Sequence, residues 1–373
     1  MNSDYIVSLQ KLQNKNTMKR WKKQKTIFFA LFVFILFILS TFYDSPNDLD
    51  RYENYSIGRS LINMSFSDIF SFYSNNGYDF IFYLGLGFFA KFESGMPLFM
   101  GIITALYYIE IFKCFLNTQG KLTPNRLLLL TGLLCIPNIL YVVNLSRTVF
   151  ALAFFAIGVN NWFNKKYILN VVFFALTFFT HAGEILFIML FYIGVIVHIL
   201  LKNKPFVTRL LCIFLPPAFF VLFRFLFLDV LQNELLIGMF FDTKYEHYLE
   251  ATGTSSLEGS IGKLASVYGC IFFSYVLLNI DKEVTLRKVL FLVFTTITVS
   301  LLTVNQNLLN RLVLVLPFFY TTYFLELLEK YRTNVISHKS KLDWFTISSF
   351  MFIMIFALII LQERKSFLPF FFS

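Results

Sequence analysis

Charged residues are scarce in this chain and make up only 14% of its 373 residues, whereas an ordinary soluble domain carries about 25%. Hydrophobic residues make up 57%. A chain this poor in charge cannot cover a water-facing surface with polar groups, which excludes most soluble classes and makes lipid the solvent for much of the molecule. No stretch is polar enough for a separate soluble domain, so we expect one membrane domain over residues 27–373 after a basic arm over residues 1–26.

Cysteine and histidine are sparse as well, with four of each. The cysteines lie singly within apolar segments and the histidines are scattered, so neither a disulfide framework nor a metal site is indicated. An obvious internal repeat is also lacking, which disfavours a transporter built from repeated halves.

The net charge of +10 is concentrated where a membrane protein would place it. Seven of the 32 basic residues precede the first apolar run: Lys11, Lys15, Lys19, Arg20, Lys22, Lys23 and Lys25. This is the positive-inside pattern and predicts a cytoplasmic N-terminus rather than a nucleic-acid partner. No small-residue cleavage site follows Ile27–Phe42, so we interpret that run as a retained anchor rather than a signal peptide.

Apolar runs long enough to cross a bilayer, which takes about 20 residues, recur along the chain. The predicted spans are Ile27–Tyr43, Pro97–Leu116, Leu127–Val143, Thr148–Phe163, Tyr167–Thr180, Glu184–Leu201, Phe206–Leu228, Leu264–Ile280, Val289–Thr303, Leu308–Leu328 and Trp344–Leu361. A further run, Tyr78–Phe92, is short and contains two glycines. The sequence therefore predicts an all-α integral membrane protein with about 11–12 transmembrane helices.

Charge bias favours a re-entrant or interfacial Tyr78–Phe92 that does not cross. Five basic clusters then face the cytoplasm: Lys121 and Arg126; Lys165 and Lys166; Lys202 and Lys204; Lys282, Arg287 and Lys288; and Lys330, Arg332, Lys339 and Lys341. Eleven spans place the C-terminus outside, where the tail pair Arg364 and Lys365 fits poorly. Two long connections, Asp44–Gly77 and Asp229–Gly262, lie on the outer face, so we expect the chemistry there.

Ionisable residues beside apolar runs are costly to place in lipid, which makes each a candidate functional residue. Arg147 opens an otherwise uncharged helix at a predicted outer junction; the alternative is an arginine that only reaches lipid head groups. His181 lies at another outer junction, with Glu184 within one helical turn as an orienting partner. An imidazole suits general acid or base work, although a lone histidine is often structural.

Further candidates are expected on the same face. Arg311 follows a cluster of amides that includes Asn310, and lipid head-group contact is again the alternative. The first outer loop would by itself be a solvated acidic loop; it carries Asp48, Asp50, Arg51, Tyr52 and Tyr55. Arg224 either serves the same pocket or pairs with Asp229. Guanidinium groups bind phosphate oxygens bidentately, so a lipid phosphate or diphosphate is the natural ligand of such a basic cleft.

Several of these short motifs resemble the EpsG-type and Wzy-type polysaccharide polymerases of bacterial envelopes. They are the loop with Asp48, Asp50, Tyr52 and Tyr55, the helix start with Arg147 and Ala151, the Phe179-Thr-His181-Ala-Gly pattern, and Asn310-Arg311 as late support. The order of spans, loops and motifs resembles that family over most of the chain. The resemblance leads us to expect a glutamate in Asn76-Gly77-Tyr78-Asp79, where this chain has an aspartate.

The resemblance implies a bundle similar to GT-C glycosyltransferases that acts on the outer face of the plasma membrane. Such enzymes transfer a growing glycan from undecaprenyl diphosphate onto the terminal sugar of another lipid-linked repeat unit. No nucleotide sugar, metal or other cofactor is implied; membrane lipids and a chain-length regulator protein are the further partners expected. The product, whether O-antigen, capsule or exopolysaccharide, stays open.

The resemblance also implies roles for individual residues. Arg147 and Arg311 would hold the diphosphate, and His181 would deprotonate or orient the acceptor hydroxyl, with Asp48 or Asp50 as the rival base. Tyr52 and Tyr55 would offer a surface for sugar stacking, unless they are interfacial belt residues. The remaining substrate-binding candidates are Arg51, Glu184, Arg224 and Asn310.

Three other classes of protein compete with this interpretation. A lipid-linked oligosaccharide flippase would have a similar number of spans, but needs charges at several depths of a cavity. A membrane O-acyltransferase would use a single histidine, but usually has more polar sequence within the membrane. A secondary transporter is disfavoured by the missing repeat and by the lack of an acidic residue deep in any span.

Overall fold

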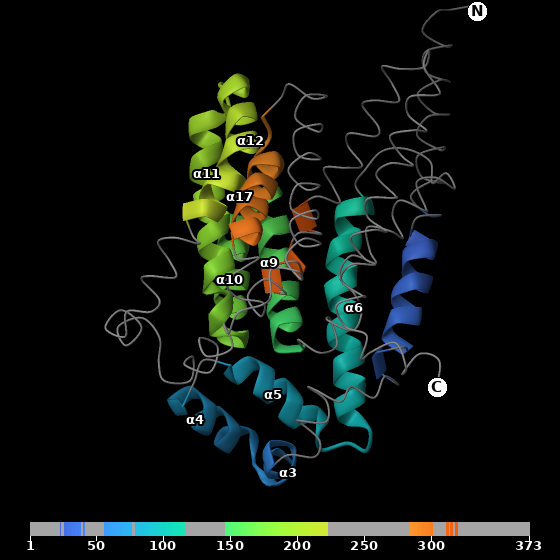
Figure 1. Cartoon of the computed structure of the whole chain (residues 1–373). Helices are drawn as coiled ribbons and strands as arrows, with labels where there is room; N and C mark the ends of the chain where they lie inside the picture. The colour runs from blue at the N-terminus through green and yellow to red at the C-terminus, as the bar shows by residue number, and fades with distance from the viewer. Residues whose placement is uncertain are drawn as a thin grey trace, which may run out of the picture. The chain divides into compact units, whose positions relative to one another are not determined.

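The computed structural model describes residues 23, 26–38, 40–41, 56–76, 79–116, 146–222 and 284–300, together with helical positions 311, 312, 314, 315, 318 and 319 (Figure 1). These residues are helical or form connections between helices, with no strand among them. They divide into two compact units, the first with described residues up to 188 and the second from 189 onward. The first unit holds α3 (Ser56–Asn63), α4 (Phe66–Asn76), α5 (Phe80–Phe89), α6 (Gly95–Leu116), α9 (Ser146–Phe163), α10 (Tyr167–Thr180), η1 (Ala182–Glu184) and the start of α11 (Ile185–Leu201).

The composition predicts a membrane protein, and the helices agree. Within the described residues, two helical stretches are long and apolar enough to cross a membrane, Gly95–Lys113 and Ala182–Leu201. Shorter apolar helices are Thr26–Ile38, Phe80–Phe89 and Tyr167–Thr180. Large apolar side chains are exposed along α10 and α11, as a lipid-facing surface requires; Ile168 is 82% exposed. The spans predicted at Leu127–Val143, Leu264–Ile280 and Trp344–Leu361 lie outside the described residues, and the number and orientation of spans stay predictions.

A tight helical hairpin of α9 and α10 forms the centre of the first unit. Helix α9 ends with Lys165 at a φ of 60°, and the amides of Lys165 and Lys166 donate to the carbonyl groups of Trp162 and Asn161. This is a Schellman ending, which stops one helix and turns the chain back into the next. The two helices approach closely because Gly158 of α9 has no side chain, and a Cβ there would come within 2.6 Å of the Phe174 ring.

The same contact between α9 and α10 accounts for a polar residue buried in an apolar helix. Asn170 of α10 is fully buried, and its side-chain amide donates to the carbonyl oxygen of Gly158 at 3.0 Å. A buried amide is costly unless it is hydrogen-bonded. The bond from Asn170 therefore satisfies this group and fixes the register of α10 on α9.

Two short helices, α3 and α4, occupy part of what the sequence indicates as an outer loop, Asp44–Gly77. Ser65 precedes α4 and exchanges hydrogen bonds with Asp68, three residues on, which is the reciprocal arrangement of a capping box. Leu61 and Ile69 are fully buried and lie next to Gly87 of α5. Helix α5 has 10 residues, so it is about 15 Å long, about half the thickness of the hydrocarbon core.

The second unit contains the rest of α11, α12 (Pro205–Leu222) and α17 (Leu286–Ser300). Gly194 of α11 lies against Leu290 of α17, and His198 contacts the carbonyl oxygen of Val284 at 3.2 Å. Helix α17 begins earlier than the predicted span Val289–Thr303, so Arg287 and Lys288 belong to the helix rather than to the connection before it. Lys288 is 3% exposed, so it is a buried residue of α17 and not part of the connection in which the sequence placed it.

Candidate functional site

Three helix ends meet in the first unit and bring three polar residues together. Asp79 directly precedes α5, Arg147 is the second residue of α9, and His181 directly follows α10. Because α9 and α10 form an antiparallel hairpin, the start of one lies beside the end of the other. Helix α5 packs against α10, which places Asp79 next to both ends.

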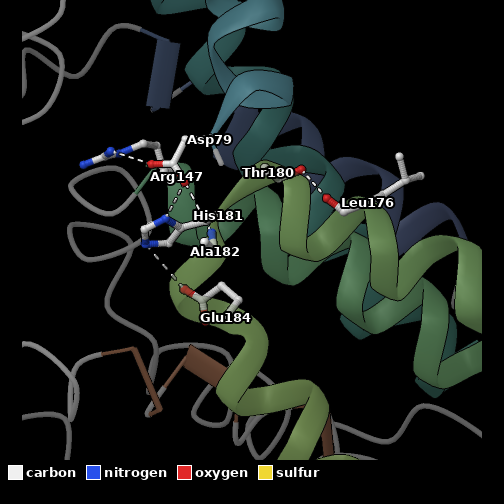
Figure 2. A network of polar contacts seen from close by, with 7 residues as sticks. All are labelled: Asp79, Arg147, Leu176, Thr180, His181, Ala182 and Glu184. Atoms are coloured by element: carbon white, nitrogen blue, oxygen red, sulfur yellow. Dashed lines mark hydrogen bonds and ion pairs between the residues drawn. The ribbon is translucent and has the colours of Figure 1, made fainter. Parts of the chain in front are cut away.

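The carboxylate of Asp79 lies between Arg147 and His181, as Figure 2 shows. Its Oδ2 accepts a hydrogen bond from Nη1 of Arg147 at 2.9 Å, within an ion pair. Its Oδ1 lies 3.1 Å from Nδ1 of His181 and accepts a hydrogen bond from the backbone amide of Ala182 at 3.3 Å. One aspartate thus connects two of the residues that the sequence analysis named as catalytic candidates.

The site is shielded but accessible. The side chains of Arg147 and Asp79 are 27% and 21% exposed, and that of His181 is 10% exposed. Burial alone would raise the pKa of Asp79, but the hydrogen bond and charge of His181, the charge of Arg147 and the amide of Ala182 together hold it below its ordinary value. Asp79 is therefore a carboxylate at neutral pH and accepts hydrogen bonds only.

Glu184, the expected orienting partner of His181, lies on the other side of the ring (Figure 2). Its Oε1 is 4.0 Å from Nε2 of His181, within ion-pair range but beyond hydrogen-bond length. The residue that binds the ring through a hydrogen bond is Asp79. The imidazole thus has a carboxylate near each nitrogen, in contact at Nδ1 and more distant at Nε2.

The local backbone presents His181 to Asp79. His181 has an extended backbone, with a φ of −158°, and its amide still donates to the carbonyl oxygen of Thr177. The hydroxyl of Thr180 donates to the carbonyl oxygen of Leu176 at 2.7 Å, within the last turn of α10 and away from the polar cluster (Figure 2). The chain leaves α10 at His181 and re-enters helix at Ala182, which directs the Ala182 amide at the same carboxylate oxygen.

The other predicted site residues do not belong to the described part of the first unit. Arg311 is described, as a partly buried helical residue of the second unit, and its role stays a prediction. The remaining candidates lie outside the described residues: Asp48, Asp50, Arg51, Tyr52, Tyr55, Arg224 and Asn310. No group of three or more His, Cys, Asp and Glu side chains in the described part of the chain is arranged to hold a metal ion.

Sequence reasoning missed Asp79 as a site residue. The available signal was an acidic residue directly before the apolar run Phe80–Phe89, in the segment where the family resemblance leads us to expect a glutamate. A carboxylate beside a run of this kind is costly without a cationic partner. Its partners are far away in sequence, 68 and 102 positions on, so no local pattern marks them.

A second polar cluster lies at the other end of α9. Glu110 of α6 is 3% exposed, forms an ion pair with Lys113 and accepts a hydrogen bond from the Asn160 amide at 3.2 Å. Asn160 follows Arg147 by 13 positions along one helix, about 20 Å. Glu110 is thus an acidic residue buried within the apolar stretch Gly95–Lys113, near its end. The expectation that no acidic residue lies deep in a span stays a prediction.

The chemistry available at the Asp79 cluster is anion binding and proton transfer. A partly exposed guanidinium suits an oxygen-rich anion, and an imidazole held by a carboxylate suits acid or base work. Nothing matches the chain among curated proteins or among solved structures. A family model described as the EpsG family matches residues 22–372, nearly the whole chain. This match confirms the resemblance seen in the short motifs around Arg147 and His181: the chain belongs to the EpsG family.

Proposed function

We propose that this protein is a polysaccharide polymerase that joins oligosaccharide repeat units carried on undecaprenyl diphosphate, on the outer face of the bacterial plasma membrane. Family membership supports a polymerase of the glycosyltransferase type in a membrane. The observation that carries the proposal is the Asp79 carboxylate, which holds a guanidinium and an imidazole side by side at one end of three helices.

The reaction needs the two functions that this cluster combines. The donor glycan leaves a diphosphate, whose growing negative charge requires a cation; Arg147 supplies a fixed one. The acceptor is a sugar hydroxyl, which must lose its proton as it attacks; His181 accepts that proton. Arg311 is the second cation for the diphosphate, and Asp48 and Asp50 are the alternative bases from the first outer loop.

The proposal includes a place in the membrane. The basic arm over residues 1–26 lies in the cytoplasm, about 11–12 helices cross the bilayer, and the Asp79 cluster faces outward. The bundle is of the GT-C kind, with the loops over residues 44–77 and 229–262 on the outer side. Glycan-linked lipids enter from the bilayer, and a chain-length regulator protein is the expected protein partner.

Cells with and without the gene test the proposal when their surface glycans are separated by size. The proposal predicts that loss of the gene collapses the ladder of polymer lengths to a single repeat unit, and that the intact gene restores it. Loss of the single unit from the surface as well indicates a flippase instead. An unchanged ladder that has lost an acyl group indicates an O-acyltransferase.

A further inference from the structure

The bonds of Asp79 determine which atom of His181 is protonated. Asp79 Oδ1 lies 3.1 Å from Nδ1 of the ring, and the same oxygen already accepts the Ala182 amide. A carboxylate has no proton to donate, so the ring nitrogen must supply the hydrogen in this contact. In a neutral imidazole with its proton on Nδ1, the lone pair is on Nε2.

We infer that Asp79 is a positioning residue: it holds a proton on Nδ1 of His181, which makes Nε2 the nitrogen that takes the acceptor's proton, and its second oxygen orients Arg147 toward the diphosphate. This inference rests on the proposed function. It assigns one carboxylate to both halves of the reaction, since Oδ1 serves the base and Oδ2 serves the cation.

The proton and electrons balance along this route. The acceptor hydroxyl oxygen forms a bond to the anomeric carbon of the donor glycan and gives its proton to Nε2. The bond between that carbon and the diphosphate oxygen breaks, and the diphosphate leaves with the electron pair. The imidazolium formed lies against Asp79, and the negative charge of Asp79 stabilises it. Oε1 of Glu184 lies 4.0 Å from Nε2 of the same ring. Its proton then passes to the diphosphate or to water, which restores the base.

The charged groups around the ring within the described residues are few and come from three elements. Asp79 precedes α5, Glu184 belongs to η1, and Arg147 of α9 is bound to Asp79. Replacing Asp79 by asparagine keeps the shape but removes the charge. An asparagine amide also accepts or donates according to its orientation, so it no longer dictates the tautomer of His181. Glutamate keeps the charge and the acceptor oxygens.

The experiment reads the tautomer directly, without any assay of polymerisation. Full-length protein with ¹⁵N-labelled histidine, in lipid nanodiscs, is studied by NMR at a pH where the rings are neutral, and the signals absent from His181→Gln belong to His181. We expect the Nδ1–H tautomer in the wild type and in Asp79→Glu. We expect a mixture, or the Nε2–H form, in Asp79→Asn. An Nε2–H tautomer in the wild type overturns the inference without reference to any variant.

Activity measurements then separate this inference from the proposed function. Polymer formation in Asp79→Asn should fall by about 10²–10⁴-fold in kcat, because the wrong ring nitrogen carries the proton, while Asp79→Glu keeps most of it. Wild-type activity in Asp79→Asn overturns the inference. If the tautomer responds as expected but the wild type makes no polymer, Asp79 still positions His181 and the proposed function is wrong.

Discussion

Arg147 Nη1 and Asp79 Oδ2 are 2.9 Å apart although 68 positions separate the two residues in the sequence. The contact joins the start of α9 to the start of α5. It places a cation at a helix end, where we propose that it binds the diphosphate of a lipid-linked glycan. What the guanidinium does there is open to a direct test.

Arg147→Ala should lower polymer formation by about 10²-fold or more, since removal of one group that stabilises a leaving-group charge typically costs that much. Arg147→Lys should retain only a small part of the activity, because an ammonium keeps the charge but loses the planar fork that binds phosphate. The measurement is the rate of ladder formation in membranes with matched protein levels. Lys202→Ala, an exposed lysine in the turn after α11, is the control. A full ladder from Arg147→Ala contradicts the assignment.

The contacts of Asp79 also set a pH dependence of stability. Its pKa is lowered, so these contacts stabilise the fold above the ordinary value of 3.8, and that stability is lost only as pH falls through the lower folded value. The advantage of the wild type over Asp79→Asn in thermal unfolding should therefore not decline between about pH 8 and pH 5, and should shrink below about pH 4. Protonation of the neighbouring imidazole enlarges the difference rather than reducing it. A decline that begins near neutral pH contradicts the account.

Several helices were predicted well from the apolar runs, because a run of apolar residues between two polar turns can be recognised from neighbouring residues alone. Tyr167–Thr180 matches α10 to the residue, and Pro97–Leu116 misses only the first two residues of α6. The sequence predicts a long connection over Asp44–Gly77, which in the structure contains the short helices α3 and α4. The Ser65–Asp68 capping box was a local signal for the second of them.

The candidate site was predicted only in part, because its central contact is not local. Arg147, His181 and Glu184 stand out as single polar residues beside apolar runs. Asp79 also lies beside an apolar run, but its partners are 68 and 102 positions away and are identified only once the α9–α10 hairpin has set two helix ends beside it. The sequence therefore predicts Glu184, a close neighbour in sequence, as the residue that orients His181. In the structure the hydrogen bond of His181 is to Asp79 instead.

Gly158→Ala should destabilise the α9–α10 hairpin that carries Arg147 and His181. In an open helix the change would stabilise by about 1 kcal/mol, but here the new Cβ meets the buried ring of Phe174. Overpacking of this kind costs about 1–3 kcal/mol, so the net effect is destabilising. Thermal unfolding in detergent measures it, and Ala175→Leu, on an exposed position of α10, is the control. A more stable Gly158→Ala variant contradicts the packing described.

Lys165→Gly should stabilise the same hairpin by about 0.5–1 kcal/mol, because Lys165 has a φ of 60° that favours glycine. The matched control is its neighbour, with a φ of −94°, where Lys166→Gly gains nothing from a released backbone. Thermal unfolding of both variants in one detergent gives the comparison. Equal effects of the two substitutions contradict the Schellman ending.

Glu110→Gln separates the polymerase from the transport alternatives. Glu110 is buried and bound to Asn160, at a point about 20 Å along α9 from Arg147. A glutamine keeps an oxygen that accepts from Asn160, so the variant should form the same glycan ladder as the wild type. The amount and length of surface glycan are measured together. Loss of even single repeat units from the surface of Glu110→Gln cells would instead indicate that this charge serves transport.

The most direct measurement uses purified protein in nanodiscs with single repeat units linked to polyprenyl diphosphate. The account predicts glycans of two and more units, with one polyprenyl diphosphate released for each bond formed. Arg147→Ala and His181→Gln should each form both products at least about 10²-fold more slowly. Unaltered single units after incubation with wild-type protein, in nanodiscs where the Nδ1–H tautomer shows the site to be folded, would contradict the claim that this protein polymerises lipid-linked glycans.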